Sequence, residues 1–316
     1  MNRFSFFVCL TVLFIGSSAS NLFATDPPPA KAWKVVCYNV FNGFRGGQSF
    51  KKTVKWINAQ KSDVLGLQEL LGWNEAKLKE AALKWKHPYA VTLKGGGYNI
   101  GLTSVDPIEV IERRTKGFHH GVLHCRVRGI DILVTHLWPG GVPQQLGEVK
   151  VLTDIVRKMR KKGRQVLVMG DFNAHASSDR GWMKDQGPLI KRRLAGDERK
   201  SPRARFFKKG TFTYHIMDAV LKAQLHDVAR DAFDARYKSP SRSQLLQLGS
   251  YPTRVLKHVR EEKDQRGFLE RIDFILVTKG LAKVCTRAVV CRKPSVLEEL
   301  SDHYPVQATF ELKLEK

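Results

Sequence analysis

The chain has 316 residues, 42% of them hydrophobic and 27% charged, and 54 Lys and Arg residues stand against 30 Asp and Glu residues. This composition is ordinary for a globular protein with a core. It excludes a membrane-spanning mature chain, because no segment after the N-terminus is apolar enough to cross a bilayer. The formal net charge of +24 favours polyanionic partners, with nucleic acid first and anionic lipid or a phosphorylated small molecule as alternatives. A general solubility adaptation would give the same charge, and no feature predicts a protein partner.

The N-terminal segment has the layout of a secretory signal peptide. Arg3 precedes an apolar run from Phe4 to Ile15, and small residues follow that run. We expect a signal peptide over residues 1–24, a disordered leader over residues 25–32 and a secreted or periplasmic protein. An uncleaved membrane anchor is the alternative.

Four cysteines follow the expected signal peptide: Cys37, Cys125, Cys285 and Cys291. Only Cys285 and Cys291 are close in sequence. A disulfide between these two and a set of buried free thiols both remain open. None of the four shows the paired short spacing of a zinc site.

Residues 33–316 are predicted to form one domain, since no repeat or long linker divides them. Short apolar runs between turn residues predict buried strands at Trp33 to Tyr38, Val64 to Leu67, Ile130 to Thr135, Gln165 to Met169, Ile272 to Val277 and Val306 to Leu312. Helical periodicity is found at Trp73 to Leu83, Leu146 to Met159 and Asp218 to Phe233. Interleaved strands and helices predict an α/β or mixed sandwich fold. The basic stretch from Arg180 to Gly210 is interpreted as an inserted surface loop.

Polar residues recur where the predicted strands end. These are Asn39, Glu69, His136 and Asp171 after four strands, Asp273 at the start of another, and Asp302 with His303 before the last. Singly, each has a structural explanation, such as capping a helix or packing in a core. Together they supply a carboxylate and an amide for a hard divalent cation, a further carboxylate to orient water and a His with a carboxylate partner. Phosphoester hydrolysis needs this combination, because the charge that develops on phosphate must be neutralised.

The same residues carry a resemblance to a known family. Six segments look like its ordered motifs: Cys37-Tyr38-Asn39-Val40, Leu67-Gln68-Glu69, Thr135-His136-Leu137, Gly170-Asp171-Phe172-Asn173-Ala174, Arg271-Ile272-Asp273-Phe274 and Ser301-Asp302-His303-Tyr304-Pro305-Val306. The chain resembles the endonuclease/exonuclease/phosphatase superfamily. That resemblance implies a four-layer sandwich of two packed β-sheets flanked by helices. It also implies Mg²⁺ as the usual metal, with Mn²⁺ or Ca²⁺ as substitutes.

The resemblance also implies roles for the site residues. Glu69, with Asn39 and Asp302, would hold the metal. Asp171 would position or deprotonate the attacking water, and Asn173 would donate a hydrogen bond to the phosphate. His136 would contact the scissile phosphate, as would His303 oriented by Asp273. Direct attack of water, without a covalent enzyme intermediate, is the expected mechanism.

The substrate depends on loops that the motifs do not cover. Tyr98 and Asn99 are candidate substrate contacts, although Val105 replaces the Arg that many family members place after a small hydroxyl residue. Lys191, Arg192 and Arg193, in the basic stretch, are candidate phosphate contacts for a nucleic acid substrate.

A nuclease is therefore the first expectation for the activity. A lipid phosphodiesterase of the sphingomyelinase type would need an exposed apolar hairpin, for which Trp138 and Trp182 are the candidate aromatic residues. A small-molecule or inositol phosphatase is a further alternative. A catalytically silent polyanion-binding protein is the alternative from another class.

Overall fold

The computed structural model describes residue 1 and residues 31–208, 211–256, 259 and 267–312. Nearly all of the predicted signal peptide and leader lies outside the described residues. Lys31 and Ala32, expected in the leader, instead belong to the first strand, β1 (Lys31–Asn39), where they pair with the last strand of the chain. No helix in the described part of the chain is both long and apolar enough to cross a membrane.

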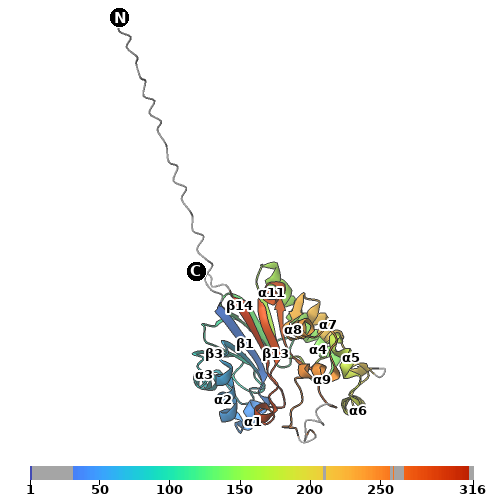
Figure 1. Cartoon of the computed structure of the whole chain (residues 1–316). Helices are drawn as coiled ribbons and strands as arrows, with labels where there is room; N and C mark the ends of the chain where they lie inside the picture. Colours follow the sequence, from blue (N-terminus) through green and yellow to red (C-terminus); the bar gives the residue numbers. More distant parts are fainter. Residues whose placement is uncertain (2–30, 209–210, 257–258, 260–266, 313–316) are drawn as a thin grey trace.

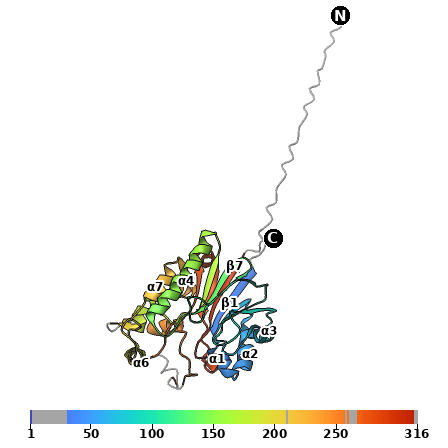
Figure 2. The same ribbon diagram turned by 180° about the vertical axis from the view of Figure 1, so that it is seen from behind.

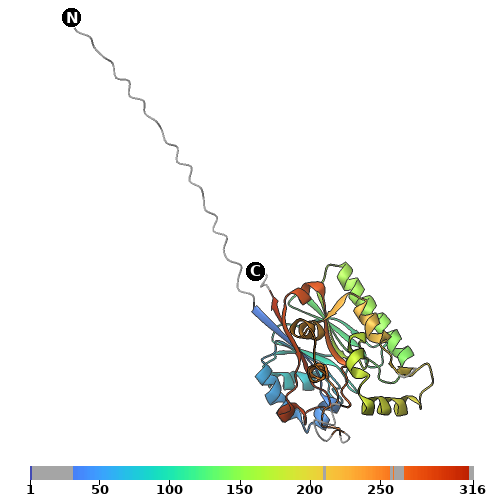
Figure 3. The same ribbon diagram turned by 45° about the vertical axis from the view of Figure 1, so that its right-hand side comes forward.

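Two six-stranded mixed β-sheets form the centre of the molecule (Figure 1). In the first sheet the order is β13 (Cys285–Val290), β14 (Val306–Leu312), β1, β2 (Val64–Gln68), β4 (Gly101–Ser104) and β3 (Tyr89–Thr92). Strand β1 is parallel to β2 and antiparallel to β14, so the first and last strands of the domain lie side by side (Figure 3). This pairing brings the two ends of the sequence into one sheet.

The second sheet has the order β11 (Leu225–Asp227), β12 (Asp273–Thr278), β8 (Val166–Asp171), β7 (Ile130–His136), β6 (Val122–Val127) and β5 (Glu109–Arg114). Strand β8 is buried along its whole length, and its side chains alternate between two cores. Leu167 and Met169 enter the core between the sheets, whereas Val166 and Val168 face the helices outside. The sheets approach so closely that a Cβ on Gly66 would lie 2.6 Å from Met169 Cε.

Helices form the two outer layers (Figure 2). On the side of the first sheet lie α2 (Phe50–Gln60) and α3 (Glu75–Leu83), and on the outer face of the second lie α4 (Val142–Lys161) and α7 (His215–Leu221). Each presents an apolar stripe to the core, as Val149, Leu152 and Val156 do in α4. This arrangement confirms the expected four-layer sandwich.

The structure describes further α-helices besides these four. They are α1 (Phe41–Gly46), α5 (Arg180–Met183), α6 (Gly187–Asp197), α8 (Val228–Arg236), α9 (Arg242–Leu245), α11 (Lys279–Lys283) and α12 (Pro294–Leu297). A two-stranded hairpin, β9 (Phe207–Lys208) with β10 (Thr211–Phe212), follows α6.

Two predictions about secondary structure were wrong. The segment from Asp218 to Phe233 is not one helix, because Leu225–Asp227 forms a strand that pairs with β12, and Asp227 then caps α8 by accepting from the Arg230 amide. The stretch from Arg180 to Gly210 is not an irregular loop in its described part. It contains α5 and α6, which bury Trp182, Met183 and Leu189 in a small core of their own.

All four described cysteines are free. Cys37 and Cys125 are buried, and Cys285 and Cys291 are half-buried. Of the two possibilities left open by the sequence, the structure has free thiols rather than a Cys285–Cys291 bridge.

Candidate active site

The ends of four parallel-paired strands bring the predicted polar residues together. Strand β1 ends beside β2 with Asn39 opposite Gln68, so Glu69 follows next to Asn39. Strand β7 ends beside β8 with His136 opposite Asp171, and Asp171 in turn pairs with Asp273. Since the two sheets pack face to face, both sets of strand ends open into one cavity of about 500 Å³.

The cavity is lined by residues from across the sequence. They are Phe41, Asn42, Glu69, Tyr98, His119, His120, His136, Trp138, Pro139, Asp171, Asn173, Arg193, Tyr251, Ile272, Asp302 and His303. Every residue predicted for the catalytic set either lines this cavity or contacts a residue that does. One site is therefore assembled from both sheets.

Asn39 joins the carboxylates of the two halves of the site. Its buried amide nitrogen donates to Glu69 Oε1 at 3.1 Å and to Asp171 Oδ2 at 3.0 Å, while its oxygen accepts from the Phe41 amide at 3.0 Å. Asn39 remains a predicted metal ligand, since its oxygen accepts one hydrogen bond and keeps a second lone pair. Its amide nitrogen lies between the carboxyl groups of Glu69 and Asp171.

The segment after β1 has a rare backbone conformation. All residues from Phe41 to Gly47 have a positive φ, between 47° and 93°, so α1 is a left-handed turn. Non-glycine residues in this conformation cost about 1–2 kcal/mol each. The turn directs the Asn42 amide onto Glu69 Oε2 at 2.9 Å. Together Asn39 and Asn42 hold both oxygens of the Glu69 carboxylate, whose own φ is also positive at 57°.

Asp171 lies at the centre of the site. Its Oδ1 accepts from the Asn173 amide at 2.9 Å, and its Oδ2 lies 3.4 Å from His136 Nε2 and 3.7 Å from His303 Nε2. Asn173 has φ 47° and donates its side-chain amide to the Leu137 carbonyl at 3.1 Å. The backbone turn after β8 thus presents both residues to the cavity.

His303 and Asp273 form a buried pair. Asp273 Oδ2 is 2.8 Å from His303 Nδ1, and the Asp273 and Ile272 amides are held by the Ser250 hydroxyl at 3.1 Å. Burial would lower the pKa of His303, but the negative charges of Asp273, Asp302 and Asp171 raise it well above its ordinary value. His303 is therefore a charged donor aimed at the cavity.

His136 has the opposite electrostatic character. Burial, assisted by the charge of His303, lowers the pKa of His136 to about 4 despite the nearby Glu69. The ring is stacked on His120 with centroids 4.3 Å apart and planes at 12°. Two histidines in one cavity are thus driven to different protonation states, which is the arrangement that separates acid and base roles in catalytic sites.

Two carboxyl groups of the site, Asp171 and Asp302, have raised pKa values. Burial raises the pKa of Asp171 to about 8, with Asp273 and Glu69 adding to the effect and His303 opposing it. Burial likewise raises the pKa of Asp302 to about 6, with Glu69 and Asp273 adding to the effect and His303 again opposing it. Several acids close together without an equal number of cations are typical of a site that binds a metal ion.

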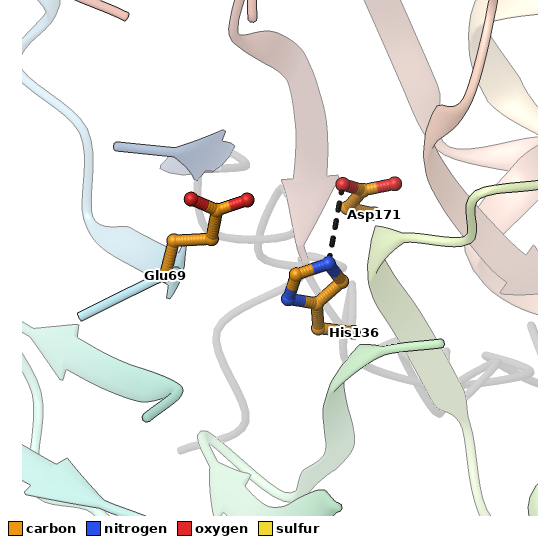
Figure 4. A group of neighbouring side chains, drawn as sticks. All are labelled: Glu69, His136 and Asp171. Atoms are coloured by element: carbon orange, nitrogen blue, oxygen red, sulfur yellow. Dashed lines mark ion pairs between the residues drawn. The ribbon is translucent and has the colours of Figure 1, made fainter. Parts of the chain in front are cut away.

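The donor set fits a divalent cation. Ligand atoms of Glu69, His136 and Asp171 lie within 4.8 Å of one another (Figure 4). The same holds for ligand atoms of Asp171, Asp273 and His303. Asp273 Oδ1 is also buried without a hydrogen-bond partner. A hard cation such as Mg²⁺ prefers the carboxylate oxygens of this set to the imidazole nitrogens.

Tyr98 and Asn99, the two candidate substrate contacts, differ in position. Tyr98 lines the cavity, is 41% exposed and donates its hydroxyl to Asn42 Oδ1 at 2.7 Å. Asn99 is fully buried and does not line the cavity. Its side chain bonds the backbone of Trp73 and Lys94, so the expectation that Asn99 contacts substrate was wrong.

The three basic candidates of α6, Lys191, Arg192 and Arg193, also differ in their positions relative to the cavity. Arg193 lines the cavity and binds Glu270, a fully buried carboxylate that also accepts from Arg192 at 2.6 Å and contacts His175 at 2.8 Å. Lys191 is exposed and lies outside the cavity lining. Arg192 and Arg193 therefore attach helix α6 to the buried Glu270 beside the cavity. The helix is not the solvated basic loop that the sequence indicated.

Sequence reasoning missed several residues of the cavity. His119 and His120 precede β6 instead of following a strand, so the search for polar residues at strand ends passed over them. Tyr251 packs on His303 with ring centroids 4.9 Å apart, and no sequence signal pointed to it. Trp138, considered as a membrane-dipping residue, lines the cavity, whereas Trp182 is only 3% exposed in a core.

Fold and site together define a sandwich hydrolase that acts on phosphoesters. A family model described as the endonuclease/exonuclease/phosphatase family matches residues 36–303. The chain belongs to this family. No curated protein matches its sequence.

Solved structures share the fold at low sequence identity. An AP endonuclease from Archaeoglobus fulgidus is 18% identical with a TM-score of 0.60, and the match covers 89% of this chain and 100% of that one. The 3′ phosphatase NExo from Neisseria, bound to a product DNA hairpin, is 19% identical with a TM-score of 0.63 over 89% and 100% of the two chains. The 3′-5′ exonuclease NExo from Neisseria meningitidis is 20% identical with a TM-score of 0.63 over 88% and 100%.

Proposed function

We propose that the protein is an exported, divalent-metal-dependent phosphodiesterase that hydrolyses nucleic acid by direct attack of water on phosphorus. The observation that carries this proposal is the composition of one cavity. Glu69, Asp171 and Asp302 line it together with His136 and His303, which differ in protonation state. Carboxylates to hold a cation and orient water, beside a charged donor, are what phosphoester hydrolysis requires.

Glu69 and Asp302 would hold the metal, most suitably Mg²⁺ because the ligands are carboxylates, with Mn²⁺ or Ca²⁺ as substitutes. When bound, the cation would neutralise charge on a nonbridging phosphate oxygen. Asn39 and the Asn42 amide keep the Glu69 carboxylate in place for this purpose. The left-handed turn after β1 thereby serves to orient a metal ligand.

Asp171 would position the attacking water and accept its proton. Asn173, held beside it by the turn after β8, would donate to the phosphate as charge develops. His303, kept charged and oriented by Asp273, would donate to the phosphate or to the leaving oxygen. Neutral His136 would hydrogen-bond the phosphate from the opposite wall.

Two features support nucleic acid as the substrate. The net charge of +24 attracts a polyanion. Structures that share the fold include a 3′ phosphatase in complex with a DNA hairpin product. Export rests on the signal-like segment over residues 1–24, which lies outside the described residues.

A panel of substrates tests this function. Purified mature protein would be incubated with plasmid DNA, single-stranded RNA, sphingomyelin vesicles and a chromogenic phosphodiester, each with Mg²⁺ and with a chelator. We expect DNA or RNA to be cut with Mg²⁺ only. Preferred cleavage of sphingomyelin would contradict the nucleic acid assignment, and hydrolysis of none would contradict the enzymatic one.

A further inference from the structure

Four rings line one wall of the cavity beside the catalytic residues. Tyr98, His119, His120 and Trp138, which we call the aromatic shelf, come from the loops before β4 and β6 and after β7. His119 lies 3.9 Å from Trp138 and 4.5 Å from His120 between ring centroids, and Tyr98 lies 5.9 Å from His120. The rings therefore form one connected surface.

The shelf continues directly from the reacting centre. His120 is stacked on His136, and His136 Nε2 is 3.4 Å from Asp171 Oδ2. A phosphate placed against Asp171 would have this wall as its neighbour. Of the shelf rings, Tyr98 and His119 are exposed and Trp138 is half-buried, so an incoming ring would meet accessible π-surface.

The shelf is held in place by its surroundings. A Cβ on Gly140 would lie 2.1 Å from Trp138 Cζ2, so the indole packs directly against the Gly140 backbone. The His119 amide donates to Glu148 Oε1 at 2.6 Å, and the Trp138 amide donates to Glu148 Oε2 at 2.8 Å. One buried carboxylate of α4 thus holds the backbone of two neighbouring members of the shelf, His119 and Trp138.

The chemistry of the shelf favours a neutral, flat partner beside an anion. Burial, with the charges of His136, His119 and Lys94, lowers the pKa of His120 to about 3, so its ring is uncharged. Among the described residues, neither His119 nor His120 belongs to a group of ligand atoms close enough to hold a metal. Aromatic surface next to a cationic or metal-binding groove is how single-stranded nucleic acid is held, with bases on rings and phosphates on charges.

We propose that the aromatic shelf is a stacking site for the unpaired base of the nucleotide that carries the scissile phosphate. This inference rests on the proposed function and specifies its substrate as a single strand or an unpaired end. Stacking needs only the π-face of a base, so the site would accept all four bases.

Equilibrium binding measurements can distinguish the contribution of the base to affinity from that of the phosphate. Titration calorimetry in Mg²⁺ would compare 5′-dAMP with deoxyribose 5-phosphate, which has the same phosphate and carries a hydroxyl at C1′ in place of the base. We expect the wild-type protein to bind 5′-dAMP about tenfold more tightly. Equal affinity for the two ligands would overturn the proposal.

Two variants test whether the preference for 5′-dAMP depends on the aromatic shelf. Trp138→Ala removes one ring, and Gly140→Ala displaces the same indole without removing it. Both should reduce the affinity ratio to about one while leaving the affinity for deoxyribose 5-phosphate within roughly twofold. Tyr89→Ala, an exposed aromatic change outside the cavity lining, is the matched control and should keep the preference. A preference that survives both shelf variants would contradict the assignment.

The two proposals can fail separately. Base-dependent binding without any phosphodiester cleavage would support the shelf and contradict the proposed activity. Cleavage of oligonucleotides by a protein that binds both ligands equally would support the activity and contradict the shelf.

Discussion

Asp273 and His303 form the best-defined contact of the site, with 2.8 Å between Oδ2 and Nδ1. The carboxylate fixes the ring and maintains its positive charge. Asp273→Asn keeps the shape of the side chain but removes its charge, so His303 loses both orientation and protonation. We expect kcat on a phosphodiester to fall about 10²–10³-fold while thermal stability changes little.

Asp154→Asn is the matched control for this substitution, because Asp154 pairs with Arg157 on the exposed face of α4. It should leave the rate unchanged. A rate for Asp273→Asn within threefold of the wild type would contradict the assigned role of the pair.

Residues of the candidate site were predictable where a strand pattern preceded them. Asp171 and His136 follow buried apolar runs, and the structure places them opposite each other at the ends of β8 and β7. His120, which lines the cavity and stacks on His136, was missed because it comes before its strand and not after one. Asn99 was assigned wrongly because its neighbour Tyr98 faces the cavity while its own side chain turns to the backbone.

At the level of the elements, the left-handed turn α1 positions Glu69. Gly43 lies within it, and a Cβ there would be 2.5 Å from the Leu71 carbonyl oxygen. Gly43→Ala should lower the free energy of unfolding by about 1–3 kcal/mol more than Gly46→Ala, whose added Cβ meets nothing within 4 Å at a similar φ. Urea denaturation measures both.

Gly43→Ala and Gly46→Ala should also differ in their metal-dependent cleavage activity. Displacement of the turn by Gly43→Ala moves the Asn42 amide away from Glu69, so metal-dependent cleavage should fall at least tenfold, whereas Gly46→Ala should lie close to the wild type. Equal activities would show that the turn does not position the Glu69 carboxylate.

Glu270 joins helix α6 to the site. Burial would raise its pKa, but Arg193, His175 and Arg192 lower it well below the ordinary value. A lowered pKa means that this contribution to stability is present above about pH 4.3, the ordinary value for Glu, and is lost as the pH falls further. Glu270→Gln should reduce the free energy of unfolding by about 3 kcal/mol at pH 7.

The pH dependence provides the control for this prediction. The difference between wild type and Glu270→Gln, measured by urea denaturation, should shrink as the pH is lowered from 5 towards 3, because Glu270 of the unfolded chain is then protonated while the folded carboxylate stays ionised. A difference that stays constant over this interval would contradict an ionised Glu270 in the folded protein.

Elements were predicted correctly where one periodicity persisted over several residues. The strand from Val166 to Met169 and the helix around Val149 to Met159 are examples. The prediction of one helix from Asp218 to Phe233 was wrong because a three-residue strand, Leu225–Asp227, is specified by pairing with β12 rather than by its own pattern. The order of Arg180 to Asp197 depends on a distant carboxylate, Glu270, which local sequence does not reveal.

For the whole molecule, the excess of positive charge predicts salt-sensitive binding of nucleic acid. Lys191 is exposed on α6 and precedes Arg192 and Arg193, which bind Glu270. Lys191→Gln should weaken binding of a single-stranded oligonucleotide and reduce the slope of log K against log salt by about one. Fluorescence anisotropy over a range of salt concentrations measures this slope.

The matched control is Lys279→Gln, since Lys279 follows β12 at the end of the strand opposite Asp273. Its slope should equal that of the wild type. Equal slopes for all three proteins would remove Lys191 from the nucleic acid interface.

The four-layer sandwich was implied by the resemblance that six ordered motifs carry, whereas the strand and helix patterns alone indicated an α/β or mixed sandwich fold. The substrate could not be predicted from the motifs, because the cavity walls include loops, such as those of Tyr98 and His119, that no strand pattern constrains. Net charge indicates a polyanion but is shared by nucleic acid, lipid and small phosphates.

The most direct test of the account compares wild type with Asp171→Asn on a 5′-labelled single-stranded oligonucleotide, with Mg²⁺ and with a chelator. We predict that the wild type cuts only with Mg²⁺ and that Asp171→Asn is slower by about 10³-fold or more while unfolding at a similar temperature. Cutting in the chelator, or cutting by Asp171→Asn at the wild-type rate, would contradict metal-assisted attack by a water positioned on Asp171.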